Sequence, residues 1–489
     1  MSKAIVIGAG IAGLAASLRL RKKGYDVEVF EANAYAGGKL HAFEQDGFRF
    51  DAGPSLFTMP HLVDELFRLF DLDPSEEFRY IRKKTVCNYF WEDGKRFSVS
   101  SDIDQFVKEA AGTFGVDESK IRKYLHSNKV KYDLAGGIFL EKSLHRLDTF
   151  LDRDVFRALS RFFRLDVNTS LDRVNRKALG DPKLVQLFNR YATYNGSSPF
   201  RTPGIMSMIP HLEMHYGTFL PEGGMHEISQ SLYRLAVRQG VVFRFNERAD
   251  RIIVENGTAT GVRSSSGDHR AALVVSNMDV YPTYRRLLPD QPQPERILNS
   301  ERSGSALIFY WGINRSFPEL DLHNIFFSKD YEKEFSCQFD KGTFADDLTV
   351  YINITSKDIP SDAPSGGENW FVMVNAPANK GQDWTSLKAA AKSSILSKIN
   401  KCLNKDISSH IVTESILEPV EIQSRTGSHL GSLYGASSNS KFSAFLRHPN
   451  FSRNIRGLYF CGGSVHPGGG IPLCLQSAKI MADQITSLL

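Results

Sequence analysis

The sequence predicts a mixed α/β fold in which one nucleotide-binding domain is assembled from separated parts of the chain. Three observations predict it. A short apolar strand leads into a glycine turn and a helix near the N-terminus, a second apolar strand leads into glycines near the C-terminus, and apolar strands alternate with a helix between residues 291 and 415. A chain of 489 residues is too long for one ordinary hydrophobic core, so two or more regions are expected.

The elements near the N-terminus follow the order strand, glycine turn, helix, strand and acid. The apolar run Ala4–Ile7 leads into Gly8-Ala9-Gly10-Ile11-Ala12-Gly13. A helix is expected over residues 14–23, and the next strand, Asp26–Phe30, ends at Glu31. This order is typical of the first unit of a Rossmann-like dinucleotide-binding domain.

Each residue type in this unit has a physical role. Gly8 permits the tight turn, Gly10 lets the backbone approach a pyrophosphate, and Gly13 lets the helix pack closely on the sheet. The N-terminus of the helix offers free N–H groups and a partial positive charge to phosphates. Glu31 is placed to accept hydrogen bonds from ribose hydroxyls. The alternative is a glycine turn in some other α/β protein, and the surrounding strand, helix and acid argue against it.

Two segments after Glu31 distinguish between cofactors. They are Ala36-Gly37-Gly38-Lys39 and Phe48-Arg49-Phe50-Asp51-Ala52-Gly53-Pro54. Here the chain resembles the large flavoprotein family that includes amine oxidases, protoporphyrinogen oxidases and phytoene desaturases. The resemblance implies FAD, with the glycine turn near the pyrophosphate, Lys39 as a cation beside it, and the Asp-x-Gly segment near the flavin.

The C-terminal region carries a second anchor. Residues 457–463 form an apolar run that ends in glycines, and a helix through about Met481 follows residues 464–472. This pattern resembles the terminal flavin motif of the family, in which a helix N-terminus stabilises negative charge on the reduced ring. A third part has a helix from Gly223-Gly224-Met225 to about Gln239, then strands at 241–245, 249–254 and 272–276. The resemblance implies an adenine contact at the second of these strands.

The resemblance therefore implies a set of FAD-contacting residues drawn from distant parts of the chain. They are Gly8, Gly10, Ala12, Gly13, Glu31, Ala32, Gly38, Lys39, Gly53, Pro54, Ser55, Ala249, Asp250, Asn277, Gly463, Ile471 and Pro472.

Four segments resemble one branch of the family, the carotenoid desaturases. They are His466-Pro467-Gly468-Gly469-Gly470-Ile471-Pro472, Tyr194-Asn195-Gly196-Ser197-Ser198-Pro199-Phe200, Pro221-Glu222-Gly223-Gly224-Met225 and Gly431-Ser432-Leu433-Tyr434-Gly435. The second segment is more similar to desaturases that act on hydroxylated carotenoids than to phytoene desaturases. The resemblance implies formation of a C=C bond, with a hydride equivalent passing to FAD.

This reaction requires few titratable groups. An extended polyene must be held against the flavin in a long apolar tunnel that excludes water. Neither a metal nor a catalytic triad is expected, and the sequence has no HExxH or GxSxG motif. His466 is the one candidate catalytic residue; it would orient the flavin or help the proton leave. The favoured interpretation is structural, a hydrogen bond to the glycine loop, and Cys461 is interpreted as a buried, unreactive thiol.

Three further functions remain as alternatives. An amine or porphyrinogen oxidase would have the same fold. A polyene cis/trans isomerase would use the same tunnel without net oxidation, and a non-catalytic FAD-binding protein would keep only the cofactor site. No second nucleotide-binding motif of comparable quality is evident, so oxygen or a membrane quinone is the expected electron acceptor.

Composition bears on partners and location. The formal net charge of +5 is small for this length, and no nucleic-acid partner is expected. Five cysteines without CxxC spacing fit a reducing cytoplasm.

No apolar stretch is long enough to span a bilayer. Residues 144–179 mix Arg and Lys with apolar residues at helical spacing, which fits either a membrane-surface helix or a lid on its own domain. The family resemblance implies peripheral membrane association.

The predicted architecture is that of amine oxidases and phytoene desaturases, a Rossmann-like FAD domain with an interleaved substrate domain. Residues 1–100, 221–290 and 416–489 form the predicted FAD-binding domain, and residues 101–220 a helical lid or membrane-facing region. Residues 291–415 form the predicted substrate-binding domain. Its strands are expected at 306–313, 348–354 and 370–375 and its helix at 384–402, giving a sheet under the substrate.

Overall fold

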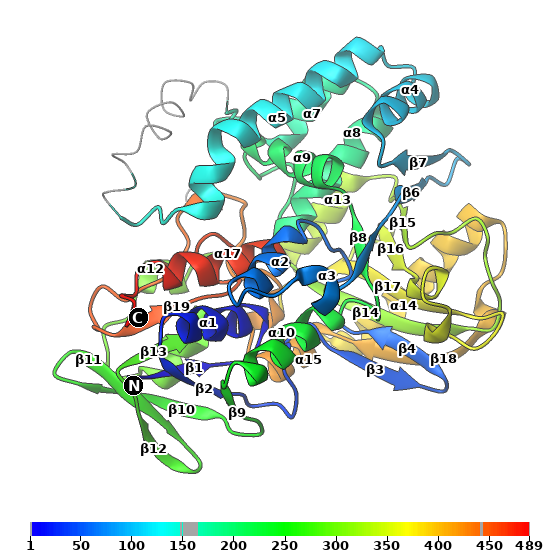
Figure 1. Cartoon of the computed structure of the whole chain (residues 1–489). Helices are drawn as coiled ribbons and strands as arrows, with labels where there is room; N and C mark the ends of the chain where they lie inside the picture. The colour runs from blue at the N-terminus through cyan, green and yellow to red at the C-terminus, as the bar shows by residue number, and fades with distance from the viewer. Residues whose placement is uncertain (1, 147–148, 150–164, 441–443, 489) are drawn as a thin grey trace.

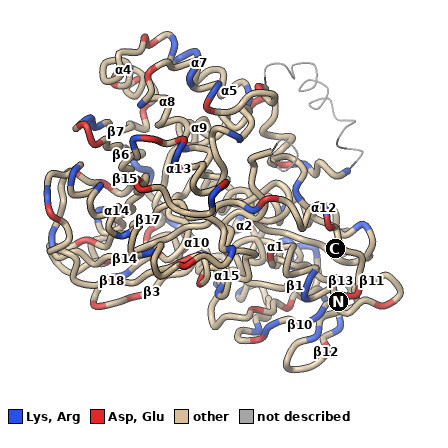
Figure 2. Tube along the Cα trace, turned by 180° about the vertical axis from the view of Figure 1, so that it is seen from behind, with Lys and Arg blue, Asp and Glu red and all other residues tan. Residues whose placement is uncertain are grey.

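The computed structural model describes residues 2–146, 149, 165–440 and 444–488 (Figure 1). Two sheets organise it. One is a parallel sheet near the two chain ends, and the other is a larger mixed sheet on the opposite side of the molecule. Acidic and basic residues are interspersed along the chain trace in both parts (Figure 2).

The parallel sheet has five strands, and its order is β19-β13-β1-β2-β9. Their bounds are Leu458–Phe460, Leu273–Ser276, Lys3–Ile7, Asp26–Phe30 and Val242–Arg244. Every neighbouring pair is parallel. The predicted Rossmann-like sheet is confirmed, and it draws strands from three distant parts of the chain.

Alternate residues of this sheet enter two different cores, because successive side chains in a strand point to opposite faces. Ala4 and Val6 pack with helices α1 (Ile11–Lys22), α10 (Glu227–Arg238) and α17 (Ile471–Ala482). On the other face, Ile5 and Ile7 pack with a small antiparallel sheet. Its strands are β10 (Ala249–Glu255), β11 (Thr258–Ser264) and β12 (Gly267–Arg270).

The second sheet has seven strands, and its order is β18-β14-β17-β16-β15-β6-β7. Their bounds are Ile411–Leu417, Ser305–Ile313, Glu368–Ala376, Val350–Asn353, His323–Phe326, Thr85–Phe90 and Arg96–Ser100. All neighbours are antiparallel except β15 and β6. The predicted sheet under the substrate is thus extended by β6 and β7, which the sequence analysis placed with the N-terminal FAD segment. The ladder between β6 and β15, with Asn88 opposite Asn324, joins β6 to this sheet, and β7 pairs with β6 at its edge.

One face of the seven-stranded sheet is covered by helix α14 (Trp384–Leu403). Leu307, Trp311, Trp370 and Val372 are buried beneath this helix and form a core of their own. The residues between them in sequence point to the opposite face. That face borders a cavity.

The region from 101 to 220 is mostly helical where it is described, as predicted, and it stands over both sheets (Figure 1). Its longer helices are α4 (Ile103–Phe114), α5 (Glu118–Glu141), α7 (Leu171–Leu179) and α8 (Pro182–Asn189). Residues 147–148 and 150–164 of the predicted amphipathic segment 144–179 lie outside the described residues, and α7 is its described C-terminal end. Among the described helices, none is both long and apolar enough to cross a membrane.

Short elements complete the described chain. The strands are β3 (Ala42–Gln45), β4 (Phe48–Asp51), β5 (Tyr80–Arg82) and β8 (Phe219–Pro221). The helices are α2 (His61–Arg68), α3 (Pro74–Glu77), α9 (Ile209–His211), α11 (Val280–Pro282), α12 (Glu295–Leu298), α13 (Tyr331–Ser336) and α15 (Pro419–Thr426). The 3-10 and π turns span Arg190–Asn195, Gly204–Met208, Leu212–Tyr216, Thr283–Leu287, Cys337–Lys341, Thr355–Lys357, Pro360–Asp362, Ser408–His410 and His429–Gly431.

Candidate active site

A cavity of about 1090 Å³ extends from the glycine turn after β1 to the uncovered face of the seven-stranded sheet. All the predicted cofactor-contacting residues line it except Gly13 and Asp250, and His466 lines it too. Gly13 lies inside α1, whereas Asp250 is an exposed residue of β10 whose neighbour Ala249 points inward. The fold thus brings these distant segments to one space.

The glycine turn is shaped by close backbone approaches. Gly8 has a φ of +96°, in the region that favours glycine. A Cβ atom on Gly13 would lie 2.0 Å from the Gly8 carbonyl oxygen, and one on Gly10 would lie 2.8 Å from Oδ1 of Asn277. Side chains at these positions would therefore collide with the turn or with Asn277, and their absence leaves the backbone open to a ligand.

Glu31 closes the turn from the end of β2. Its Oε2 accepts a hydrogen bond from the Ala9 amide at 2.7 Å, and its Oε1 accepts one from the Asn33 amide at 2.8 Å. The side-chain amide of Asn33 donates to the same Oε1 at 2.9 Å. A carboxylate has about four acceptor sites, so Glu31 keeps capacity for about one ribose hydroxyl.

Lys39 lines the cavity and is partly buried. Its Nζ donates to the carbonyl oxygen of Leu433 at 2.9 Å, and burial lowers its pKa to about 8. Charging an amine in this position is costly because only neutral carbonyls solvate it. A bound anion such as a pyrophosphate would favour the charged form.

Two arginines add positive charge near Lys39. Arg447 donates from Nη1 to the carbonyl oxygen of Tyr434 at 2.6 Å, and burial lowers its pKa to about 10. Arg302 forms a buried ion pair with Asp279. With Lys39, these groups bring three cations and one carboxylate to this end of the cavity, a surplus that fits an anionic ligand.

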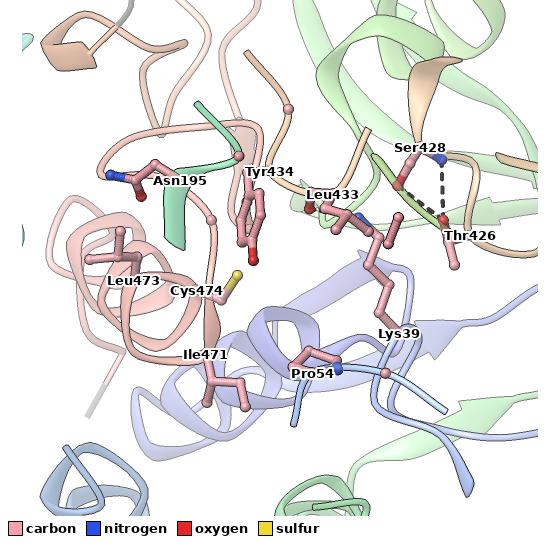
Figure 3. Close-up of a pocket in the computed structure, with 18 of the residues that line it drawn as sticks. Lys39, Pro54, Asn195, Thr426, Ser428, Leu433, Tyr434, Ile471, Leu473 and Cys474 are labelled. Atoms are coloured by element: carbon pink, nitrogen blue, oxygen red, sulfur yellow. Dashed lines mark hydrogen bonds between the residues drawn. The ribbon is translucent and has the colours of Figure 1, made fainter. Parts of the chain in front are cut away.

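Three of the segments that resemble carotenoid desaturases meet at Tyr434. A Cβ on Gly196 would lie 2.7 Å from the Tyr434 ring, and a Cβ on Gly469 would also lie 2.7 Å from it. Figure 3 shows Tyr434 beside Cys474, with Lys39 and Pro54 bordering the same space. The ring fits only because glycine occupies both flanking positions, which is a packing reason for these segments to occur together.

His466 ties the terminal loop to the helical region. Its Nε2 lies 2.8 Å from the Lys142 carbonyl oxygen, and its backbone N–H donates to the His448 carbonyl oxygen. Since a carbonyl oxygen only accepts, Nε2 carries the hydrogen. Burial lowers the pKa of His466 to about 4. The ring contact is therefore to the end of the helical region, instead of to the glycine loop that the sequence analysis expected.

The cysteines near the site are shielded. The Cys461 thiol is buried, its Sγ lies 3.6 Å from the Ala12 carbonyl oxygen, and burial raises its pKa. Cys474 lines the cavity, and burial raises its pKa to about 11. Both thiols are thus neutral near pH 7. Among the described residues, no group of three or more His, Cys, Asp or Glu side chains could hold a metal ion.

The seven-stranded sheet supplies the other wall of the cavity. Most of the lining residues share one face, since Ile308 is opposite Met373 and Met373 is opposite Tyr351. Consecutive residues line the cavity only near the starts of β6 and β14. The lining residues from this sheet are Val86, Cys87, Ser305, Ala306, Ile308, His323, Ile325, Tyr351, Phe371, Met373, Asn375 and Leu417, and Thr349 lines the cavity just before β16. Met206, Met208 and Leu212 line the cavity from the helical region. This part is mainly apolar.

The glycine turn at residues 8–13, Glu31, Lys39 and the N-termini of α1 and α17 form a cradle, and this cradle fits a flavin nucleotide. Helices α1 and α17 both begin at glycines, Gly10 and Gly470, without a side-chain cap. Their first-turn N–H groups are left for an anion or for negative charge on a ring. The glycine turn, the acid and the surplus of cations are the donor set that a dinucleotide requires.

Comparisons with known proteins agree with this geometry. A family model described as flavin containing amine oxidoreductase matches residues 11–486. A 1-hydroxycarotenoid 3,4-desaturase of Flavobacterium sp. (strain P99-3) is 57% identical over 485 residues, covering 99% of each chain. A 4,4'-diapolycopene oxygenase of Methylomonas sp is 32% identical, covering 99% of this chain and 98% of its own.

Solved structures share the fold at low identity. An oxidoreductase from Methanosarcina mazei matches with a TM-score of 0.68 at 14% identity, covering 98% of this chain and 100% of its own. Cyclohexylamine oxidase from Brevibacterium oxydans IH-35A matches with a TM-score of 0.61 at 17% identity and 99% coverage of both chains. The chain belongs to the family of flavin-containing amine oxidoreductases, and within it to the carotenoid desaturases. It is therefore a flavin-dependent oxidoreductase.

Several cavity residues were not predicted from the sequence. Arg447 and Asp279 line the cavity from outside any recognisable motif, and Arg302, which also lies outside any motif, is paired with Asp279 without lining the cavity itself. Arg190, Glu213, His323 and Tyr351 also line or border the cavity, and they come from a 3-10 turn, a π turn and two strands. Strand alternation was the available signal for Tyr351, because it faces the same side as the apolar residues around it.

Proposed function

We propose that the protein is an FAD-dependent desaturase that introduces C=C bonds into an acyclic, hydroxylated carotenoid. One observation carries this proposal: a single cavity joins a dinucleotide cradle to an apolar sheet face, in a chain that is 57% identical to a named hydroxycarotenoid desaturase over nearly its whole length. Glu31 and Ala249 line the same cavity as Ile471, which supports a dinucleotide such as FAD.

The cofactor and the chain divide the chemistry. When bound, FAD supplies the acceptor for a hydride equivalent from the carbon chain. The sheet face with Ile308, Phe371 and Met373 holds the extended polyene, and methionines of the helical region cover it. This apolar enclosure keeps water from the reacting carbons. The predicted cofactor contacts at the glycine turn and at Lys39 orient the nucleotide.

We assign His466 a positioning role instead of the role of base. Its Nε2 donates to the Lys142 carbonyl, and its lowered pKa disfavours proton uptake near neutral pH. It holds the loop before α17 against the end of the helical region.

The remaining partners are part of the proposal. Reduced flavin passes its electrons to oxygen or to a membrane quinone. We place the protein in the cytoplasm with peripheral association to the membrane, because its proposed apolar substrate partitions into bilayers. The domain boundaries at residues 100, 220, 290 and 415 stay predictions.

The direct test is expression in hosts that supply acyclic, hydroxylated and cyclic carotenoids, followed by absorption and mass analysis of the pigments. A product lighter by two hydrogens, with absorption at longer wavelength, is expected from the hydroxylated acyclic substrate. An unchanged mass would instead favour the cis/trans isomerase. No change with any carotenoid would reject a polyene substrate and would favour an amine or porphyrinogen oxidase.

Oxygenation is a second candidate, because two sets of relatives are named as carotenoid oxygenases at 32% and 30% identity. The same mass analysis separates it from desaturation. An oxygenase product gains oxygen, whereas a desaturase product only loses hydrogen.

A further inference from the structure

The cavity wall formed by the seven-stranded sheet has one polar corner. On β14 and β17 the lining residues are mostly apolar, but β15 and β16 contribute His323 and Tyr351. Both point to the cavity face, since Tyr351 is opposite Ile325 and His323 is opposite Asn353. A polyene offers no polar atom to such a corner, so the corner requires another explanation.

The two side chains form a directed chain of hydrogen bonds. The Tyr351 hydroxyl lies 2.9 Å from Oγ of Ser55 and 2.8 Å from Nδ1 of His323. The Asn353 amide nitrogen, which can only donate, lies 3.3 Å from the same Nδ1. Nδ1 is therefore the acceptor of the ring, and the neutral imidazole carries its hydrogen on Nε2.

The Nε2–H of His323 is left unused. His323 is only 3% exposed, and its Nε2 has no hydrogen-bond partner among the described residues. Burial lowers the pKa of His323 to about 3, so the ring is neutral at ordinary pH. A buried donor without a partner is rare because it loses its bonds to water. A ligand with an acceptor atom would satisfy it.

A second polar network closes the same corner. Arg190 and Glu213 form a buried ion pair at 2.7 Å, and Tyr191 and Tyr194 donate to the Glu213 carboxylate. Arg190, Tyr194 and Glu213 line the cavity. Most of their donors and acceptors are paired with one another, so this network fixes the wall, and Nε of Arg190 is its one buried nitrogen without a partner among the described residues. The guanidinium of Arg190 is already held by the Glu213 carboxylate, whereas Nε2–H is the sole donor of the neutral His323 ring.

We propose that Nε2–H of His323 donates a hydrogen bond to the hydroxyl oxygen of a hydroxylated carotenoid, which makes His323 a specificity-determining residue oriented by Tyr351. The inference rests on the proposed desaturase function. In the reaction named for the Flavobacterium relative, the hydroxylated carbon is two carbons from the nearer carbon of the new double bond. The group that binds the hydroxyl must therefore lie near the cofactor. Ser55, which begins the hydrogen-bonded chain, directly follows Pro54 in the predicted flavin segment.

The test compares kcat/KM of the holoenzyme for a 1-hydroxylated acyclic carotenoid with kcat/KM for the same polyene without the hydroxyl. The wild-type ratio is expected to be about 100 or more, since a buried polar group left unpaired disfavours the analogue that lacks the hydroxyl. His323→Leu should reduce the ratio at least about tenfold, mostly through KM. His323→Gln keeps a donor near the position of Nε2 and should recover part of the ratio.

Two further variants isolate the cause. Tyr351→Phe removes the hydroxyl that orients the ring and should reduce the ratio less than His323→Leu. His410→Leu, a matched change at the rim of the same sheet and outside the cavity, should keep the wild-type ratio. Flavin content reports folding for each variant, and quenching of protein fluorescence by each carotenoid measures binding without turnover.

The outcomes separate the two proposals. If wild type desaturates the carotenoids but the ratio is unchanged in both His323→Leu and Tyr351→Phe, this inference is wrong and the proposed function stands. A wild-type holoenzyme that desaturates neither carotenoid would overturn both.

Discussion

The two sheets border one cavity, but they contribute to it in different ways. The five-stranded sheet acts through its backbone, because it ends in glycine turns and uncapped helix N-termini that present N–H groups. The seven-stranded sheet acts through side chains, because one face enters the α14 core and the other lines the cavity. The comparison indicates that the proposed flavin site depends on where side chains are absent, whereas the proposed substrate wall depends on which side chains are present.

The largest expected effect tests the backbone half. Gly13→Ala places a Cβ 2.0 Å from the Gly8 carbonyl oxygen, so α1 must move away from the turn. We expect a loss of at least about 3 kcal/mol in the free energy of unfolding, together with loss of most bound flavin. Denaturant titration and flavin absorbance measure the two quantities.

Gly112→Ala is the matched control for this change. Gly112 lies in helix α4, and a Cβ there would meet nothing within 4 Å. The same substitution should therefore raise stability by about 0.5–1 kcal/mol and leave flavin content unchanged. Equal effects of the two substitutions would show that the glycine turn tolerates a side chain and that its function does not depend on the absence of one.

A smaller effect tests the side-chain half with two neighbouring residues of β17. Val372 is fully buried beneath α14, whereas Met373 lines the cavity. Val372→Thr buries a hydroxyl and should cost about 1–3 kcal/mol of stability with little change in activity. Met373→Gln should change stability by less than about 1 kcal/mol and lower kcat/KM for the polyene about tenfold. A stability loss from Met373→Gln that exceeds the loss from Val372→Thr would reject the assignment of the two faces.

The same contrast explains what could be predicted from the sequence. The first βαβ unit and the terminal strand and helix were predicted within a few residues, because glycine spacing and the acid after β2 are local patterns. The strands β14 and β17 were also predicted, since both are continuous apolar runs. The hairpin of β3 and β4 was not, because four-residue strands carry too short an alternation.

The long-range strand pairing and the side chains that line the cavity could not be predicted from the sequence. Nothing near Cys87 indicates that β6 will pair in parallel with β15, more than two hundred residues away. Arg447 and His323 obtain their place in the cavity from tertiary packing alone. By contrast, the expected hydrogen bond from His466 to the glycine loop was wrong in its partner, because the described structure brings Lys142 against this ring.

The smallest expected effect concerns Lys39, one of the three cations near the glycine turn and the one whose pKa is lowered to about 8. In the flavin-free protein burial lowers the pKa of Lys39 from 10.5 to about 8, so the unfolded chain binds more protons between those values. Stability should therefore rise with pH across that window. A bound pyrophosphate favours the charged amine, so flavin binding above pH 8 must take up a proton. The affinity for FAD should then fall by up to about tenfold for each pH unit above 8.

Fluorescence titration of the flavin-free protein with FAD between pH 7 and 9.5 measures this dependence. Lys39→Met should bind FAD more weakly at pH 7 and show a flat profile, because the titrating charge is gone. Lys380→Met removes an exposed lysine outside the cavity and should keep the wild-type slope. A wild-type affinity that is constant across this range would mean that Lys39 does not face the phosphates, and the surplus of charge would then rest on Arg302 and Arg447 alone.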